Sequence, residues 1–317
     1  MTWNDKPVLV TGGCGFIGIN LVSMLVEAGA RVRVYDNLSV GTRDVLDPFG
    51  AKVQLVQADV RDLSALSEAC HGIDVVIHLA AQPGVIPSIL DPQNDYEINA
   101  GGTFNALLAA QRAEVGAFVL ASSNAVVGEF TPGTDETKTP RPLSPYGASK
   151  MAGEAYCSAF AGAYGMRTVA LRFANAYGPR STHKQSVIAR WIKRILDSEN
   201  LVIYGDGKQI RDFIHVQDMC RAMMLAAESD VRGEVFHIAS GRETTVLELV
   251  QLLGNVVGRK LEVVHEEQRD GEALCIAPSV EKAKRLINFE AQVALPEGLA
   301  ETYAWFQGRH ERSEVAL

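Results

Sequence analysis

The chain has 317 residues, of which 47% are hydrophobic and 21% charged, and its net charge is −8. This composition is typical of a soluble globular protein, and the length predicts one principal domain with a second, smaller one or a sizeable insertion. The acidic balance argues against a binder of nucleic acid or of anionic membranes, because such proteins present basic surfaces.

The five cysteines are scattered, odd in number and without Cys-x-x-Cys spacing. This pattern favours reduced thiols over a disulfide framework or a zinc site. No signal-like segment or apolar run of transmembrane length is present. We therefore expect a cytoplasmic protein without a metal site.

The amino-terminal segment has the pattern of a dinucleotide-binding unit. Val8-Leu9-Val10 is typical of a buried parallel strand, and residues 16–28 have helical periodicity. Between them, Gly12, Gly15 and Gly18 would allow a tight turn and close approach of a pyrophosphate to the helix N-terminus. Strand, glycine-rich turn and helix together make this a strong signal.

A second strand over residues 31–35 ends on Asp36, eighteen positions after Gly18. A carboxylate there can accept hydrogen bonds from the adenosine ribose and would repel a 2′-phosphate, which favours NAD over NADP. The alternative is that Asp36 only opens the turn Asp36-Asn37.

Further strand–helix units follow at 53–56, at 58–60 and at 75–81, which predicts an α/β fold with a doubly wound parallel sheet of Rossmann type. Asp59-Val60 would bracket an adenine ring at a strand end. Ala80-Ala81 supplies small residues where the backbone passes close to a cofactor.

Ser122 and Ser123 follow a predicted strand over 117–121. Loops at the carboxyl ends of parallel strands carry the site in open α/β sheets, so these serines point towards the chemistry. By position alone, they could equally be ordinary loop formers.

Tyr146 and Lys150 form a candidate acid/base pair. Ser144-Pro145 predicts a helix start, and residues four apart then share one face of the helix. An ammonium beside a phenol favours the phenolate and so lowers its pKa. The alternative is a half-exposed tyrosine and a solvated lysine on an ordinary helix.

The strand–helix rhythm breaks after the strand that ends at Phe173. This predicts an NAD-binding domain over 1–174, to which 209–240 return, and a smaller α/β substrate domain over 175–208 and 241–317. We expect the last helix at 297–306, followed by a fraying tail from 309 to 317.

Arg211 lies among apolar residues and therefore needs an anionic partner. That partner could be Asp212 or Asp218 in an internal ion pair, or a ligand phosphate. Arg269 is a second candidate for phosphate binding, whereas His215 is interpreted as structural.

These motifs resemble the extended short-chain dehydrogenases/reductases, specifically the nucleotide-sugar epimerase/dehydratase group, over nearly the whole chain. The resemblance includes Thr-Gly-Gly-Cys-Gly-Phe-Ile-Gly at 11–18, His78-Leu79-Ala80-Ala81, Ser122-Ser123, Tyr146 with Lys150, Asn175-Ala176-Tyr177-Gly178-Pro179 and Arg211-Asp212-Phe213.

The resemblance implies NAD as cofactor and a UDP-sugar as substrate. It implies that Ser123, Tyr146 and Lys150 are catalytic, with Tyr146 as the base. The cofactor-binding residues would be Gly12, Gly15, Phe16, Ile17, Gly18, Asp36, Asn37, Asp59, Val60, Leu79, Ala80, Ala81, Asn99, Tyr146, Lys150 and Phe173. The substrate-binding residues would be Ser123, Asn124, Asn175, Val187, Tyr204, Arg211, Arg269 and Ile276.

The two positions after Ser123 separate the reactions of this group. Dehydratases of the group have Asp-Glu there and decarboxylases keep a glutamate, whereas this chain has Asn124 and Ala125. The resemblance therefore implies C4 epimerisation. The chain departs from the group at Val127, where a tyrosine is usual.

The resemblance leaves the sugar open. Ser181-Thr182-His183-Lys184 replaces the Arg-Pro-Asp segment of UDP-glucuronate 4-epimerases, and Ile276 stands where a tyrosine restricts N-acetylated sugars. We expect UDP-N-acetylglucosamine/UDP-N-acetylgalactosamine or UDP-glucose/UDP-galactose.

The alternatives are a reductase, a UDP-glucuronate 4-epimerase and a non-catalytic nucleotide-sensing protein. The resemblance also implies a homodimer formed through the helices near 99–113 and 146–164.

Overall fold

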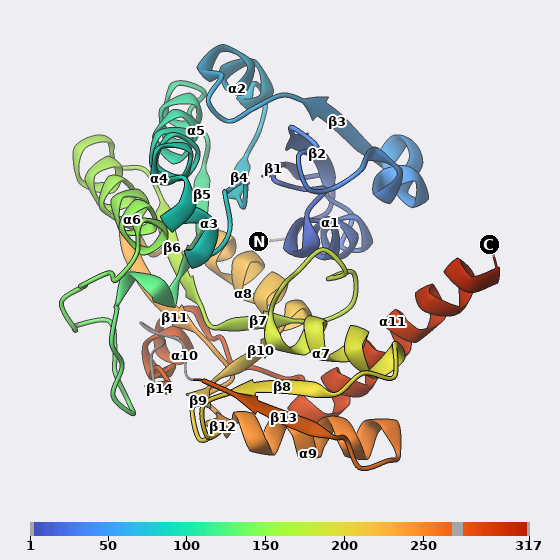
Figure 1. Ribbon diagram of the computed structural model, residues 1–317. Helices are drawn as coiled ribbons and strands as arrows, with labels where there is room; N and C mark the ends of the chain where they lie inside the picture. The colour runs from blue at the N-terminus through green and yellow to red at the C-terminus, as the bar shows by residue number, and fades with distance from the viewer. Residues whose placement is uncertain (1–2, 268–274, 316–317) are drawn as a thin grey trace.

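Seven parallel strands form the central sheet, in the order β11-β6-β5-β4-β1-β2-β3 (Figure 1). The computed structural model describes residues 3–267 and 275–315. The strands are β1 (Pro7–Thr11), β2 (Arg31–Asp36), β3 (Val53–Gln57), β4 (Val75–His78), β5 (Ala117–Ser123), β6 (Thr168–Phe173) and β11 (Glu234–Ile238). The order reverses between β1 and β4, and a crevice at the carboxyl ends of strands is expected at such a point. The prediction of a doubly wound Rossmann-type sheet is confirmed.

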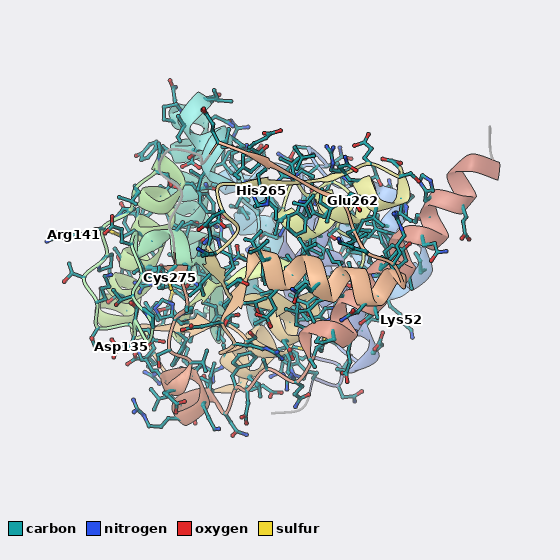
Figure 2. The ribbon with its side chains drawn as sticks, turned by 60° about the horizontal axis from the view of Figure 1, so that its bottom comes forward. Lys52, Asp135, Arg141, Glu262, His265 and Cys275 are labelled. Carbon is teal, nitrogen blue, oxygen red and sulfur yellow. The ribbon has the colours of Figure 1, made fainter. Side chains whose placement is uncertain are left out.

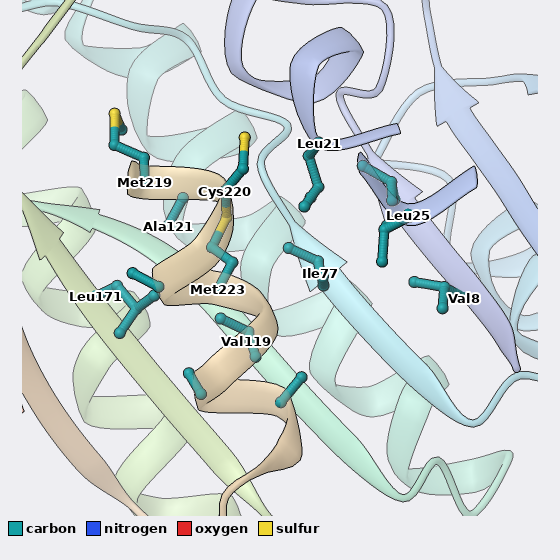
Figure 3. Packing of buried hydrophobic residues seen from close by; sticks show 14 of the residues in the cluster. Val8, Leu21, Leu25, Ile77, Val119, Ala121, Leu171, Met219, Cys220 and Met223 are labelled. Atoms are coloured by element: carbon teal, nitrogen blue, oxygen red, sulfur yellow. The ribbon is translucent and has the colours of Figure 1, made fainter. Parts of the chain in front are cut away.

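Helices cover both faces of this sheet. On one face, α1 (Phe16–Glu27) packs beside α8 (Val216–Glu228). Figure 3 shows Met219, Cys220 and Met223 of α8 among side chains of the sheet and of α1, all within one buried apolar cluster. On the other face, a second cluster joins the sheet to α2 (Leu63–Cys70), α5 (Gly102–Arg112) and α6 (Pro145–Tyr164). Two apolar layers therefore hold the carboxyl edge of the sheet in place.

Short helical segments complete the connections. They are η1 (Arg43–Lys52), α3 (Val85–Leu90), α4 (Pro92–Asp95), the π-helix η2 (Tyr96–Gly101) and η3 (Asn124–Val126). The π-helix lies directly before α5 and contacts α6. Such π-helical turns are frequent at functional sites.

A smaller α/β part follows β6 and has an apolar cluster of its own, which includes Trp191, Leu253 and Phe306. Its elements are β7 (Asn175–Tyr177), α7 (Val187–Leu196), β8 (Leu201–Tyr204), β9 (Ile210–Arg211), β10 (Phe213–His215), β12 (Thr244–Thr245), α9 (Val246–Val257), β13 (Val263–Glu266), β14 (Cys275–Ile276), α10 (Glu281–Ile287) and α11 (Leu295–Val315). Of the segment 209–240 predicted to return to the main sheet, α8 and β11 lie with that sheet, whereas β9 and β10 pair with strands of the smaller part. We therefore propose a division into 1–174 with 216–240, and 175–215 with 241–317.

The carboxyl-terminal helix is longer than predicted. The expected fraying from residue 309 is wrong, because α11 continues from Leu295 to Val315. Phe306 is buried in the cluster of the smaller part, and the Arg309 guanidinium lies 5.5 Å from the Trp305 ring centroid. Residues of good helix propensity, such as Glu311 and Arg309, continue the helix beyond Phe306, the last buried residue of its apolar face.

The proline-rich loop over 131–142 leaves the main sheet and contacts the smaller part. The Ser279 backbone N–H donates to the Thr134 carbonyl oxygen over 2.8 Å. In Figure 2, Asp135 and Arg141 of this loop lie on the same side of the molecule as Cys275 of β14. The loop thus leads from β5 to the start of α6 along the smaller part.

Candidate active site

The glycine-rich turn between β1 and α1 brings backbone into the crevice. Gly12 has φ +68°, and a Cβ there would lie 2.8 Å from the Ala80 backbone nitrogen. A Cβ on Gly18 would collide with the Gly12 carbonyl oxygen. Gly15 is the N-cap of α1 and offers no side chain to its first N–H groups. This cradle fits a pyrophosphate at a helix N-terminus, as NAD requires.

Asp36, at the end of β2, is 8% exposed and holds two loops together. Its Oδ2 accepts from the Cys14 backbone N–H over 2.9 Å, and its Oδ1 accepts from the Leu38 N–H over 2.8 Å. The turn-forming role is therefore present in the structure. Ribose binding by Asp36 stays a prediction.

Asn37 and Asp59 meet beside the ends of β2 and β3. The Asn37 Nδ2 donates to Asp59 Oδ2 over 2.9 Å, and Arg61 forms an ion pair of 2.8 Å with Asp59. The hydrogen bond from Arg61 holds the pKa of Asp59 well below its usual range. Val60 is buried next to this pair. The structure thus brings together the residues predicted to surround the adenosine.

The turn after β4 is tied to two other elements. The Leu79 and Ala80 N–H groups donate to Thr11 on β1, and the Gln82 N–H donates to Asn99 Oδ1 over 2.8 Å. Asn99 is fully buried in η2, and its Nδ2 returns a hydrogen bond of 3.0 Å to the Gln82 carbonyl oxygen. Asn99 therefore fixes the loop through Ala80 and Ala81 that is expected to pass the cofactor.

Ser123, Tyr146 and Lys150 come together at the carboxyl end of β5. The helix α6 begins as predicted, with Pro145 in its first turn and the Ser144 Oγ accepting from the Gly147 N–H. The Tyr146 and Ser123 hydroxyls share a hydrogen bond. The Lys150 Nζ donates to the Ala121 carbonyl oxygen over 2.9 Å.

Burial dominates the electrostatics of this group. It raises the pKa of Tyr146, and the hydrogen bond to Ser123 lowers it. Burial also lowers the pKa of Lys150 to about 8, against the nearby carboxylates of Asp95 and Glu154. Burial and the charge of Lys150 lower the pKa of His78 to about 3, so this imidazole is neutral. The pKa lowering of Tyr146 by Lys150 that the sequence predicts is not present in this structure.

Asn124 is 5% exposed, and its Oδ1 lies 2.8 Å from Nδ1 of His237 on β11. Burial lowers the pKa of His237 to about 3, so the imidazole is neutral and its Nδ1–H can donate to the amide. The Asn124 side chain is thus held by the protein itself. Its role in substrate binding stays a prediction.

A buried ion pair joins α6 to β6. The Arg172 Nη2 of β6 is 2.8 Å from Glu154 Oε2 of α6, and the Ser122 Oγ donates to Glu154 Oε1 over 2.5 Å. The two charged side chains are 4% and 6% exposed. Ser122 therefore hydrogen-bonds Glu154 of this pair, whereas Ser123 hydrogen-bonds Tyr146.

Four residues predicted to bind substrate line one cavity of about 230 Å³ between β7, α7 and β8. These are Asn175, Val187, Tyr204 and Arg211. The Arg190 guanidinium in the same lining lies 5.8 Å from the Tyr204 ring centroid. A cavity with basic and aromatic side chains is suited to a nucleotide diphosphate.

A larger cavity of about 340 Å³ lies at the opposite edge of the sheet. Its lining includes Val115, Gly116 and Arg167, which directly precede β5 and β6. Because sites in open parallel sheets form at the carboxyl ends of strands, we do not assign the chemistry to this cavity.

The carboxylates considered as partners of Arg211 bind other groups. Asp212 accepts from Ser240, Gly241 and Arg242, and Asp218 forms an ion pair with Arg221. The Arg211 Nη1 donates to the Ile210 carbonyl oxygen over 2.9 Å. Arg269 lies outside the described residues, as does the side chain of Ile276.

Other expectations concern metals, membranes and thiols. Within residues 3–267 and 275–315, no cluster of histidine, cysteine and carboxylate side chains could hold a metal ion. No helix among these residues is long and apolar enough to cross a membrane. All five cysteines are unpaired, and Cys14, Cys70, Cys157 and Cys220 are buried.

Sequence reasoning missed several polar groups of the site. Asp95 lies four residues before Asn99, to which it is bonded, and this helical spacing was a usable signal. Arg190 lies three residues after Val187 on the amphipathic α7. His237 could not be recognised as a site residue from the sequence, because only the pairing of β11 with β6 brings it to Asn124.

The fold and site together define a dinucleotide-binding protein with a tyrosine–lysine pair at its crevice. Residues 8–239 match the model of the NAD dependent epimerase/dehydratase family. The chain is 36% identical to a Methanocaldococcus jannaschii protein provisionally named as a UDP-glucose 4-epimerase, over 96% of this chain and 99% of that one. It is 32% identical to a dTDP-glucose 4,6-dehydratase of Streptomyces niveus, over 95% and 92% of the two chains.

Two solved structures are similar throughout. One is a UDP-N-acetylglucosamine 4-epimerase from Methanobrevibacter ruminantium in complex with UDP-N-acetylmuramic acid, with a TM-score of 0.92 and 33% identity over 96% of this chain and 99% of that one. The other is a UDP-glucose 4-epimerase from Thermotoga maritima with UDP-glucose, with a TM-score of 0.91 and 35% identity over 96% and 100%. The chain belongs to the NAD dependent epimerase/dehydratase family, and NAD is its cofactor.

Proposed function

We propose that this protein is an NAD-dependent C4 epimerase of a UDP-sugar. The favoured substrates are UDP-N-acetylglucosamine/UDP-N-acetylgalactosamine and UDP-glucose/UDP-galactose. The observation that carries the proposal is the bonded Ser123–Tyr146 pair beside buried Lys150, next to two positions without a carboxyl group.

The residues of the site can carry out both proton transfers of such a reaction. The turn with Gly12, Gly15 and Gly18 would hold NAD+, which would supply a reversible hydride acceptor for C4 of the sugar. Tyr146 takes the proton of the 4-hydroxyl group and gives it back to the 4-keto sugar, while Ser123 orients that oxygen. Lys150, buried one turn further along α6, would bind the nicotinamide ribose.

The neighbouring positions argue against elimination of water. Dehydration needs a further acid and base, but Asn124 contributes an amide bonded to His237 and Ala125 only a methyl group. Reversible oxidation of one carbon requires neither. The cavity lined by Asn175, Tyr204 and Arg211 would hold the UDP moiety.

A panel of UDP-sugars, incubated with the NAD-loaded protein and followed by NMR, tests the proposal. We expect C4 inversion to an equilibrium mixture without net consumption of NAD. Inversion only of UDP-glucuronate would identify the alternative epimerase, and stoichiometric release of NAD+ from supplied NADH would identify a reductase. Binding of UDP-sugars without any conversion would indicate a nucleotide-sensing protein and would overturn the proposal.

We also propose a homodimer through α5 and α6. The charged residues of α6 are Lys150 and Glu154, and both are buried, so its exposed face is uncharged over twenty residues. Exposed side chains on this face include Met151, Tyr156 and Tyr164. A continuous apolar face of this kind is typical of an interface.

Replacing exposed Ala159 of this face by glutamate should convert the dimer into a monomer, because burying an unpaired carboxylate in an interface is costly. Sedimentation velocity would show the halved mass. Gln251→Glu, on the exposed side of α9, is the matched control and should leave the mass unchanged. A wild-type protein that sediments as a monomer would contradict the dimer.

A further inference from the structure

A buried carboxylate beside the tyrosine–lysine pair has no role in the proposed reaction. Asp95, the last residue of α4, is 1% exposed, and both α4 and the following η2 pack against α6. Its Oδ1 accepts from the Asn99 Nδ2 over 2.7 Å. Its Oδ2 has no hydrogen-bond partner among the described residues. An oxygen left in this way is costly unless a nearby positive charge compensates for it.

Lys150 is the cation with which this carboxylate interacts. The charge of Asp95 raises the pKa of Lys150 against the effect of burial, and it also raises the pKa of Tyr146. Lys150 donates one hydrogen bond, to the Ala121 carbonyl oxygen, which carries no net charge. Asp95 is therefore electrostatically coupled to both members of the pair.

The other titratable groups that face Lys150 are already compensated or neutral. Glu154, one turn further along α6, is bound to Arg172 and Ser122. His78 of β4 is neutral and hydrogen-bonded to Thr11 and Thr103. Asp95 is thus the facing carboxylate whose charge is not already neutralised by a bonded arginine.

The same side chain is connected to the loop expected to carry the cofactor. Asn99, which binds Asp95, also holds the Gln82 backbone through both of its amide atoms. Asp95, Asn99 and Gln82 therefore form a continuous chain of contacts from the lysine charge to the turn after β4. The π-helical turn over Tyr96–Gly101 contains Asn99 and follows Asp95 directly.

We propose that Asp95 is a positioning residue of the Tyr146–Lys150 pair. The Asp95 carboxylate keeps Lys150 protonated and, through Asn99, fixes the position of that charge relative to the cofactor-binding loop. This inference deepens the proposed epimerase function. It concerns how the lysine stays charged at neutral pH although it is buried.

The direct test measures the pKa of Lys150 in the protein without substrate. Asp95→Asn removes one negative charge and keeps the shape of the side chain, so the pKa of Lys150 should fall below its value of about 8. NMR of ¹³C-labelled lysine side chains follows this titration, and Lys150→Met assigns the resonance. A midpoint that does not move would overturn the inference.

A structural role alone would not produce the pH signature expected of the loaded enzyme. Removing the Asp95 charge lowers the pKa of Tyr146 as well as that of Lys150, so both limbs of the kcat–pH profile should move to lower pH. As the pH rises, Lys150 should lose its proton earlier, so NAD+ binding should begin to weaken at a lower pH than in the wild type. Asp95→Glu, which keeps the charge, should show smaller shifts than Asp95→Asn in both the kcat–pH profile and NAD+ binding.

Controls separate the inference from protein stability and from the proposed function. Asp218→Asn changes another buried carboxylate, 2% exposed and paired with Arg221, and should leave the Lys150 midpoint in place. Asp95→Ser replaces Asp95→Asn if the latter does not fold. A falling midpoint in a protein that inverts no UDP-sugar would support Asp95 and refute the epimerase, and an unmoved midpoint in an active epimerase would do the reverse.

Discussion

Replacing Tyr146 by phenylalanine is expected to abolish C4 inversion while UDP-sugar binding and folding remain. The phenol is the group proposed to take and return the sugar proton, and loss of a positioned acid/base group costs about 10²–10⁴ in rate. The ring remains in place at the start of α6, and the hydrogen bond to Ser123 is lost. NMR of the UDP-sugar mixture measures turnover, and calorimetry measures binding.

Tyr156→Phe is the matched control for this variant. Tyr156 lies on the same helix, is 40% exposed, and its ring lies 5.1 Å from that of Phe104. Removing its hydroxyl changes no group of the site, so the rate should stay within about twofold of wild type. Near-normal inversion by Tyr146→Phe would remove Tyr146 from the mechanism.

Replacing Arg172 by methionine is expected to give the largest loss of stability, about 3–5 kcal/mol in the free energy of unfolding. Arg172 holds both oxygens of Glu154 through hydrogen bonds of 2.8–3.2 Å from its Nε and Nη2. Without the guanidinium, the Glu154 carboxylate stays buried, and the Ser122 hydroxyl is its remaining hydrogen-bond partner among residues 3–267 and 275–315. Urea unfolding followed by circular dichroism measures the loss.

Two further variants test this explanation. Combining Arg172→Met with Glu154→Leu removes both charges, so the double variant should be more stable than Arg172→Met alone. Lys284→Met breaks a surface pair whose side chains are 53% and 72% exposed, and should cost less than about 1 kcal/mol. Equal losses in Arg172→Met and Lys284→Met would contradict a special role of the buried pair.

Much of the fold could be predicted because its signals are local. The Gly12–Gly18 turn, the apolar strands and the capped start of α6 each depend on residues close in the chain. The position of Ser123 at the end of an apolar strand likewise predicts a residue at the carboxyl edge. The length of α11 could not be predicted in this way, because the residues after Phe306 are mostly polar and show no apolar periodicity.

By itself, the sequence determined the parallel sheet, the dinucleotide turn and the shared helical face of Tyr146 and Lys150. The tertiary structure decided which partner each buried polar group takes. Asn124 and His237 are 113 positions apart, and Arg172 reaches Glu154 only because β6 lies beside β5 beneath α6. It also set the charge balance of the site, since burial raises the pKa of Tyr146 where the sequence predicted a lowering by Lys150. Such effects depend on desolvation and on distances through space, which helical spacing does not specify.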